Sequence, residues 1–194
     1  MKLGRFAVLS VAVLSLTGCI AGTYTGGGWT PSPYDAEAKA TFGGNFHAID
    51  VDGDGEVFDW ESETFDPDDS FKGQFQYNDH GADVAFHGVV DGAYFSTEGN
   101  ICGAPCDRPS LYSIIGSAYF EGTYTPVPKK IGPGGRFEAL LIDNGEPGAD
   151  AGDELWIVCT SGVFAGYNSD TDGAFGVNGQ VLGGGNIKFH PPEE

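Results

Sequence analysis

The chain has 194 residues, and its 28 acidic against 9 basic side chains leave a formal net charge of −19. With 32 glycines and 11 prolines it is unsuited to a long coiled coil or helical bundle, and its 40% hydrophobic content argues against disorder. The negative charge repels phosphate backbones and excludes nucleic-acid binding.

The first residues are typical of a secretory signal peptide at 1–18. Basic Lys2 and Arg5 precede the apolar run Phe6–Leu16, which as a helix would rise about 16 Å, roughly half of a bilayer's hydrocarbon core. The run is therefore too short to span a membrane. Residues 16–19, Leu-Thr-Gly-Cys, resemble the lipobox of bacterial lipoproteins, which implies cleavage after residue 18 and lipid on Cys19.

This lipid is expected to tether the mature protein to the membrane of a bacterial cell envelope. Ile20 follows the cysteine in place of the Asp that retains some lipoproteins at the inner membrane, which favours the outer membrane. Residues 19–37 contain many breakers and no hydrophobic periodicity. We predict that they form a flexible linker behind the acylated cysteine.

Residues 38–190 are typical of a β domain. Aromatic and β-branched segments alternate with turns rich in Gly, Pro, Asn and Asp, and in Phe71–Tyr77 the rings are spaced by two or four positions. The predicted strands are 40–49, 71–77, 83–89, 92–96, 114–124, 136–142, 154–160, 162–167 and 180–189. We predict an all-β fold, a single antiparallel β-sandwich or barrel-like domain of about eight or nine strands, with a tail at 191–194.

Three segments of this domain carry a family likeness. They are 72–80 (KGQFQYNDH), 142–157 with its Asp-Asn-Gly-Glu-Pro-Gly loop, and 184–190 (GGNIKFH). In order and spacing they resemble the signatures of post-COAP-type domains of secreted and surface bacterial proteins. The resemblance covers about residues 38–190 and implies a compact β domain without established catalytic residues. The sequence departs from the pattern at 50–70, where an acidic insertion replaces a short turn.

The acidic insertion contains a calcium-loop pattern. Residues 50–61 (DVDGDGEVFDWE) match D-x-D-x-D-G-x₅-E, and Gly55 permits the tight turn. Ca²⁺ takes six to eight oxygen ligands. The predicted ligands are Asp50, Asp52, Asp54, the backbone carbonyl of Glu56, and Glu61. The alternative is a solvated acidic hairpin with Asp-Gly turns.

Two other acidic loops are weaker candidates. Residues 168–173 repeat the first half of the pattern, but position 12 falls on Gly179, which has no side chain to act as a bidentate ligand. A third loop contains Asp143, Glu146, Asp150, Asp153 and Glu154. For this loop we prefer a solvated turn over an ion site.

The cysteines indicate an incomplete set of disulfides. With Cys19 acylated, three cysteines remain in an oxidising compartment, so one thiol stays unpaired. Cys102 and Cys106 would close a short disulfide loop and leave Cys159 as a buried thiol. A bridge from either loop cysteine to Cys159 is the alternative.

Catalytic motifs are absent from the sequence: it has no nucleophile elbow, Walker loop, dinucleotide fingerprint or zincin motif. His80 and His190 could face each other across strands, but a hydrogen-bonded structural role is the preferred interpretation for both.

We therefore expect a non-enzymatic structural or interaction module, with a cell-envelope protein or polysaccharide as partner. One alternative is a small secreted hydrolase or carbohydrate-binding protein, suggested by Trp29, Trp60 and Tyr112 beside carboxylates. Another is a subunit of a surface assembly that uses an unpaired strand edge.

Overall fold

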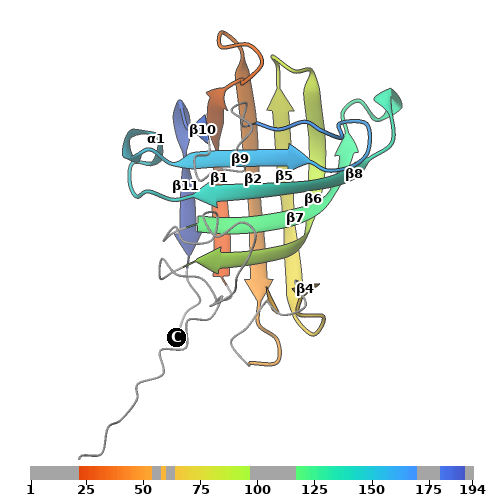
Figure 1. Cartoon of the computed structure of the whole chain (residues 1–194). Helices are drawn as coiled ribbons and strands as arrows, with labels where there is room; N and C mark the ends of the chain where they lie inside the picture. The colour runs from red at the N-terminus through yellow and green to blue at the C-terminus, as the bar shows by residue number, and fades with distance from the viewer. Residues whose placement is uncertain (1–21, 54–57, 60–63, 97–116, 170–179, 191–194) are drawn as a thin grey trace, which may run out of the picture.

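The computed structural model describes residues 22–53, 58–59, 64–96, 117–169 and 180–190. Within these residues nine strands form one curled antiparallel sheet, in the order β10-β9-β8-β7-β6-β5-β2-β1-β11 (Figure 1). The strands are β1 (Gly22–Pro31), β2 (Lys39–Ile49), β5 (Ser70–Asp79), β6 (Val84–Ser96), β7 (Ser117–Pro126), β8 (Gly135–Ile142), β9 (Glu154–Cys159), β10 (Gln180–Val181) and β11 (Gly184–His190). The predicted all-β fold is confirmed.

Four short elements lie outside this sheet or between its strands. The strands β3 (Phe58–Asp59) and β4 (Thr64–Phe65) pair with each other. The 3₁₀ turn η1 (Lys129–Ile131) and the one-turn helix α1 (Gly148–Ala151) connect β7 to β8 and β8 to β9. None of the described helices is long and apolar enough to cross a bilayer.

The sheet folds over on itself, so that β7, β8 and β9 cross in front of β1, β2 and β5 (Figure 1). The long strand β6 makes the corner: its first half pairs with β5, and its pairing with β7 shifts register between Val90 and Gly92. Such a bulge bends a strand and increases its twist. The core lies between the two halves.

Aromatic rings that lie opposite glycines fill much of this core. Phe46 faces Gly73 across β2 and β5, and Phe75 faces Gly44 and Gly88 on its two neighbouring strands. The ring centroids of Phe46 and Phe120 are 4.2 Å apart, which is typical of stacked aromatic packing. The many glycines and phenylalanines of the sequence are therefore related: glycine on one strand leaves room for a phenylalanine on the next.

The prediction of a flexible linker is wrong for Gly22–Pro31, which forms β1 in the interior of the sheet. This strand pairs with β2 along its whole length and with β11 on its other side. The buried ring of Tyr24 stacks on Phe46, with ring centroids 5.6 Å apart. Gly28 allows β11 to approach, because a Cβ atom there would lie 2.3 Å from the carbonyl oxygen of Gly184.

The predicted strand at 162–167 is also wrong. These residues form turns, in which Gly162 and Gly166 have φ angles of 80° and 87° that favour glycine. The turns bring Tyr167 into the core, where its hydroxyl contacts that of Tyr77 and donates a hydrogen bond to the buried Asp79 at 2.8 Å. The predicted strand at 180–189 is divided into β10 and β11.

Candidate metal centre

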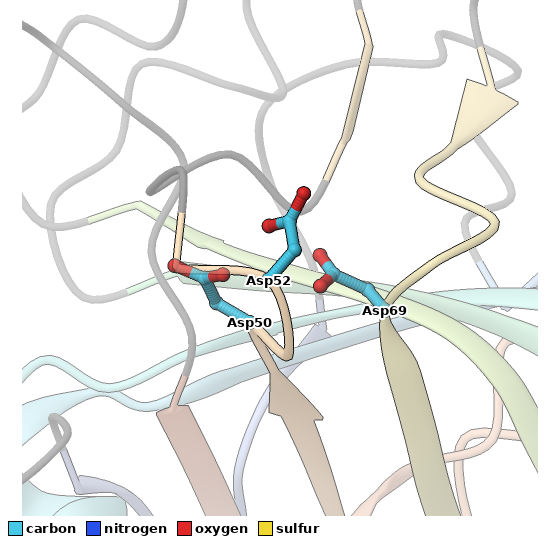
Figure 2. Close-up of side chains that lie close together, drawn as sticks. All are labelled: Asp50, Asp52 and Asp69. Carbon is cyan, nitrogen blue, oxygen red and sulfur yellow. The ribbon is translucent and has the colours of Figure 1, made fainter.

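Three carboxylates gather where the ladder between β2 and β5 ends. Ile49 and Ser70 form the last pair of this ladder, and Asp50 and Asp69 follow directly beyond it on the two strands. Asp52 lies in the turn that leaves β2, and its carboxylate approaches the other two (Figure 2). One oxygen atom from each of the three side chains lies within 4.8 Å of the other two. We call these residues the acidic cluster.

The backbone of the turn holds these side chains in place. The Gly53 N–H donates a hydrogen bond to Asp50 Oδ1 at 2.6 Å, and the Val51 N–H donates to Asp69 Oδ1 at 2.8 Å. Gly53 has a φ of 79°, a conformation that glycine adopts without strain and that reverses the chain. Local hydrogen bonds thus orient two of the three carboxylates.

The electrostatics of the acidic cluster favour a cation. Burial raises the pKa of Asp69 above its usual range, and the neighbouring charges of Asp50, Asp66 and Asp52 raise it further, while the Val51 N–H acts in the opposite direction. Asp69 Oδ2 is buried and has no hydrogen-bond partner within the described part of the chain. A buried oxygen without a partner costs about 1–3 kcal/mol, which a cation ligated at this atom would offset.

The structure brings together two of the predicted calcium ligands, Asp50 and Asp52. The other three, Asp54, Glu56 and Glu61, lie outside the described residues. Asp69 was not among the predicted ligands, because the calcium-loop pattern ends before it. The signal was available: residues just beyond the paired ends of neighbouring antiparallel strands lie close together, and strands at 40–49 and 71–77 were predicted.

The donor atoms of the acidic cluster determine which metals it suits. All are carboxylate oxygens, which suit the hard cations Ca²⁺ and Mg²⁺. Neither imidazole nor thiolate, the ligands typical of structural zinc sites, belongs to this cluster.

The acidic loop that follows β8 joins the two ends of the sheet. Asp153, which is 0% exposed, accepts hydrogen bonds from the Asn144 N–H at 2.9 Å and from the Ile187 N–H at 2.8 Å. Asp143 accepts one from the Phe189 N–H at 3.0 Å. Ile187 and Phe189 belong to the edge strand β11, so we call Asp143 and Asp153 the carboxylate clasp. The predicted solvated turn is therefore wrong for Asp153.

The clasp contains a carboxylate in an unfavourable environment. Burial raises the pKa of Asp153, although the N–H groups of Ile187 and Asn144 favour its charged form and lower the pKa in part. The nearby charge of Asp143 raises it as well. Both carboxylate oxygens of Asp153 already accept backbone hydrogen bonds, so its burial is explained by a structural role.

Other predicted site residues have structural roles where the structure describes them. Asn168, the first residue of the 168–173 loop, accepts a hydrogen bond from Trp156 Nε1–H at 3.0 Å; residues 170–173 lie outside the described part. Cys159 is a buried free thiol, as predicted, and burial raises its pKa to about 12. Cys19, Cys102 and Cys106 lie outside the described residues.

The idea that His80 and His190 face each other is wrong. His190 pairs with Thr23 at the beginning of β1, whereas the His80 N–H bonds to the carbonyl of Lys39, which pairs with the last residue of β1. The two histidines therefore lie at opposite ends of that strand. Their rings contact Thr25 and Asn78 respectively, in agreement with the preferred structural role.

Of the three aromatic residues suggested to lie beside carboxylates, only Trp29 is described. The ammonium group of Lys39 lies 3.7 Å from the centroid of its ring, a cation–π contact. Trp60 and Tyr112 lie outside the described residues.

Comparisons with known proteins add no relative: no family model, curated protein or solved structure matches this chain. The resemblance to post-COAP-type domains stays a prediction.

Proposed function

We propose that this protein is a non-enzymatic interaction module of the bacterial cell envelope, anchored by lipid on Cys19 and stabilised by Ca²⁺ at the acidic cluster. The observation that carries the calcium assignment is the buried, unpartnered Oδ2 of Asp69 among three convergent carboxylates. The lipid anchor is supported by the signal-peptide pattern and the lipobox.

The position of the cluster favours a stabilising role for the ion. It lies where β2 and β5 separate into the acidic insertion, so a bound Ca²⁺ would join the two strand ends across that insertion. Carboxylates from the rest of the predicted loop would complete the six to eight oxygen ligands that Ca²⁺ takes. We expect the weak affinity of extracellular modules, with a Kd of about 10⁻⁴–10⁻³ M.

The proposal of a non-enzymatic module rests on the roles of the buried polar groups. Asp79 and Asp153, the buried carboxylates of the described core, both accept hydrogen bonds that hold the fold together. The thiol of Cys159 has a raised pKa and stays protonated at neutral pH, which makes it a poor nucleophile.

Thermal unfolding with Ca²⁺, Mg²⁺ or a chelator tests the calcium site. At ten times its Kd, Ca²⁺ should stabilise the folded state by about 1.4 kcal/mol and raise the melting midpoint by about 3–6 °C. Asp52→Asn and Asp69→Asn should each abolish this rise, because each removes a charged ligand. In chelator, Asp69→Asn should be no less stable than the wild type, since it removes a repelled charge.

Asp68→Asn is the matched control, because Asp68 is an exposed neighbour outside the cluster. It should keep the calcium-dependent rise. Equal midpoints for the wild type in Ca²⁺ and in chelator would overturn the calcium site, as would a rise that survives both cluster substitutions.

The lipid anchor is tested by fractionating bacterial cells that express the protein. The wild type should sediment with membranes and the Cys19→Ser variant should not, because serine cannot accept the thioether-linked lipid. Recovery of both variants in the membrane fraction would contradict the proposed anchor.

A further inference from the structure

One face of the sheet lacks negative charge in a chain that has 28 acids. The strands β1, β2 and β11 contain no acidic residue, and the one in β5, Asp79, is buried in the core. These four strands are neighbours in the sheet. Side chains alternate between the faces of a strand, so their positions that point away from the core form one continuous acid-free surface. We call it the polar face.

Amides, hydroxyls and ammonium groups take the place of acids on this face. One cross-strand row runs through Lys188, Thr25, Asn45 and Gln74, which are paired in register across β11, β1, β2 and β5. All four side chains are exposed. Lys39 and Lys72 are also exposed and belong to the same face.

A shallow groove crosses the polar face beside this row. Gly27 and Gly43 pair with each other at the centre of the face, so no side chain projects from this pair, and Gly43 lines the groove. The groove has a volume of about 340 Å³ and is lined by residues of β2, β5 and β6 together with Val127; its polar lining residues are Thr41, Gln76, Asn78 and His87. Because it lies over a hydrogen-bonded ladder, its polar groups have fixed spacings.

The charge distribution indicates the class of ligand. At physiological ionic strength charges separated by more than about 8 Å are largely screened, so the exposed Lys39 and Lys72 weigh more at the polar face than distant acids do, despite the overall charge of −19. Lys188 contacts Glu146 at 3.1 Å at the rim of the face. Amide and hydroxyl side chains match the hydroxyl groups of sugars as hydrogen-bond donors and acceptors.

We infer that the polar face binds an acidic polysaccharide, with the sugar chain in the groove and its carboxylates near the lysines. This inference rests on the proposed function as an interaction module, and it names the partner. A lipid surface fits less well, because membrane-binding faces need exposed apolar side chains, whereas the exposed side chains of the cross-strand row are lysine, threonine, asparagine and glutamine.

Binding to hyaluronan, a uronate-containing polymer, tests the inference against neutral dextran and anionic phospholipid vesicles. The full chain carrying Cys19→Ser is used in chelator, so that neither a lipid anchor nor calcium contributes. We expect binding to hyaluronan that weakens with added salt, and none to dextran or vesicles. Gln76→Glu and Lys72→Glu should each weaken binding at least about tenfold, because each places a carboxylate on the face.

Lys130→Glu is the matched control, since it makes the same charge change at an exposed lysine of η1 outside the face. It should change the affinity less than about twofold. Binding to dextran alone or to vesicles alone would overturn the inference, as would no binding at all or equal losses in all three variants. The calcium-dependent melting of the same variants reports the acidic cluster separately, so either proposal can fail alone.

Discussion

The pairing of glycine with phenylalanine across strands explains how a sequence with so many glycines makes a tight core. At Gly73, a Cβ atom would lie 2.4 Å from the Cβ of Phe46, closer than the two atoms can approach. The Cα and Cβ atoms of Phe46 and the carbonyl oxygen of Asn45 occupy the space that a side chain at Gly73 would need, and the ring of Phe46 stacks on Phe120. Glycine at this position is thus required by packing on the sheet.

Gly73→Ala should therefore destabilise the fold by about 1–3 kcal/mol, the usual effect of overpacking a core. Gly43→Ala is the matched control: Gly43 lies in the adjacent strand on the outer face, where the nearest atom to a new Cβ would be 4.0 Å away. That variant should unfold within about 1 kcal/mol of the wild type. Urea denaturation measures both, and equal losses would contradict this packing argument.

At the scale of elements, the curl of the sheet is maintained by side chains as well as strand pairing. β11 pairs with β1 on one side only, and on its other side the N–H groups of Ile187 and Phe189 donate to the carboxylate clasp. A strand edge normally offers such groups to another chain. Because the clasp occupies these two donors, this edge gives little support to the alternative of assembly by strand addition.

Replacing Asp153 tests the clasp. Asp153→Ala removes the acceptor for two backbone N–H groups, which should cost roughly 2–3 kcal/mol of stability. Hydrogen exchange should show faster exchange of the Ile187 amide than in the wild type. Asp150→Ala, in the exposed part of the same loop, should change neither quantity. An Ile187 amide that stays protected in Asp153→Ala would contradict the role of the clasp.

For the whole molecule, the excess of acids makes stability depend on pH in an unusual direction. Burial raises the pKa of Asp153 and also of Glu121, where contact with Arg136 opposes the effect only in part. A group whose pKa is raised on folding stabilises the folded state below its unfolded pKa, and this stabilisation is lost as the pH rises through its folded pKa. The net charge of −19 acts in the same direction through self-repulsion.

The melting midpoint in chelator should therefore rise when the pH is lowered from 7 to 5. Most small domains that lose salt-bridged carboxylates to acid show the opposite trend. Glu146, whose pKa is lowered by hydrogen bonds from Asn186 and Lys188, opposes the rise, but it is exposed and screened by solvent. A midpoint that falls steadily over this interval would contradict the prediction.

Several features of this protein were readable from its sequence because they depend on local chemistry. Alternating aromatic residues such as those in Phe71–Tyr77 predicted strands. Successive side chains of a strand point to opposite faces of the sheet, so a strand with one buried face has apolar residues at every second position. The spacing of Asp50 and Asp52 predicted convergent carboxylates, because a tight turn brings such positions together. The buried thiol of Cys159 was predicted because this residue shares one face of a predicted strand with the apolar Leu155 and Ile157.

Only the tertiary structure decided the features that depend on distant residues. Gly22–Pro31 has no local pattern of a strand. It forms one because the ring of Tyr24 stacks on Phe46 of β2 and on Phe189 of β11. From the sequence Asp153 was predicted to be a solvated loop residue, whereas in the structure it is buried and accepts a hydrogen bond from the Ile187 N–H of β11. Asp69 joined the acidic cluster through strand pairing. Composition revealed an excess of acids, but the register of the strands determined which face has none.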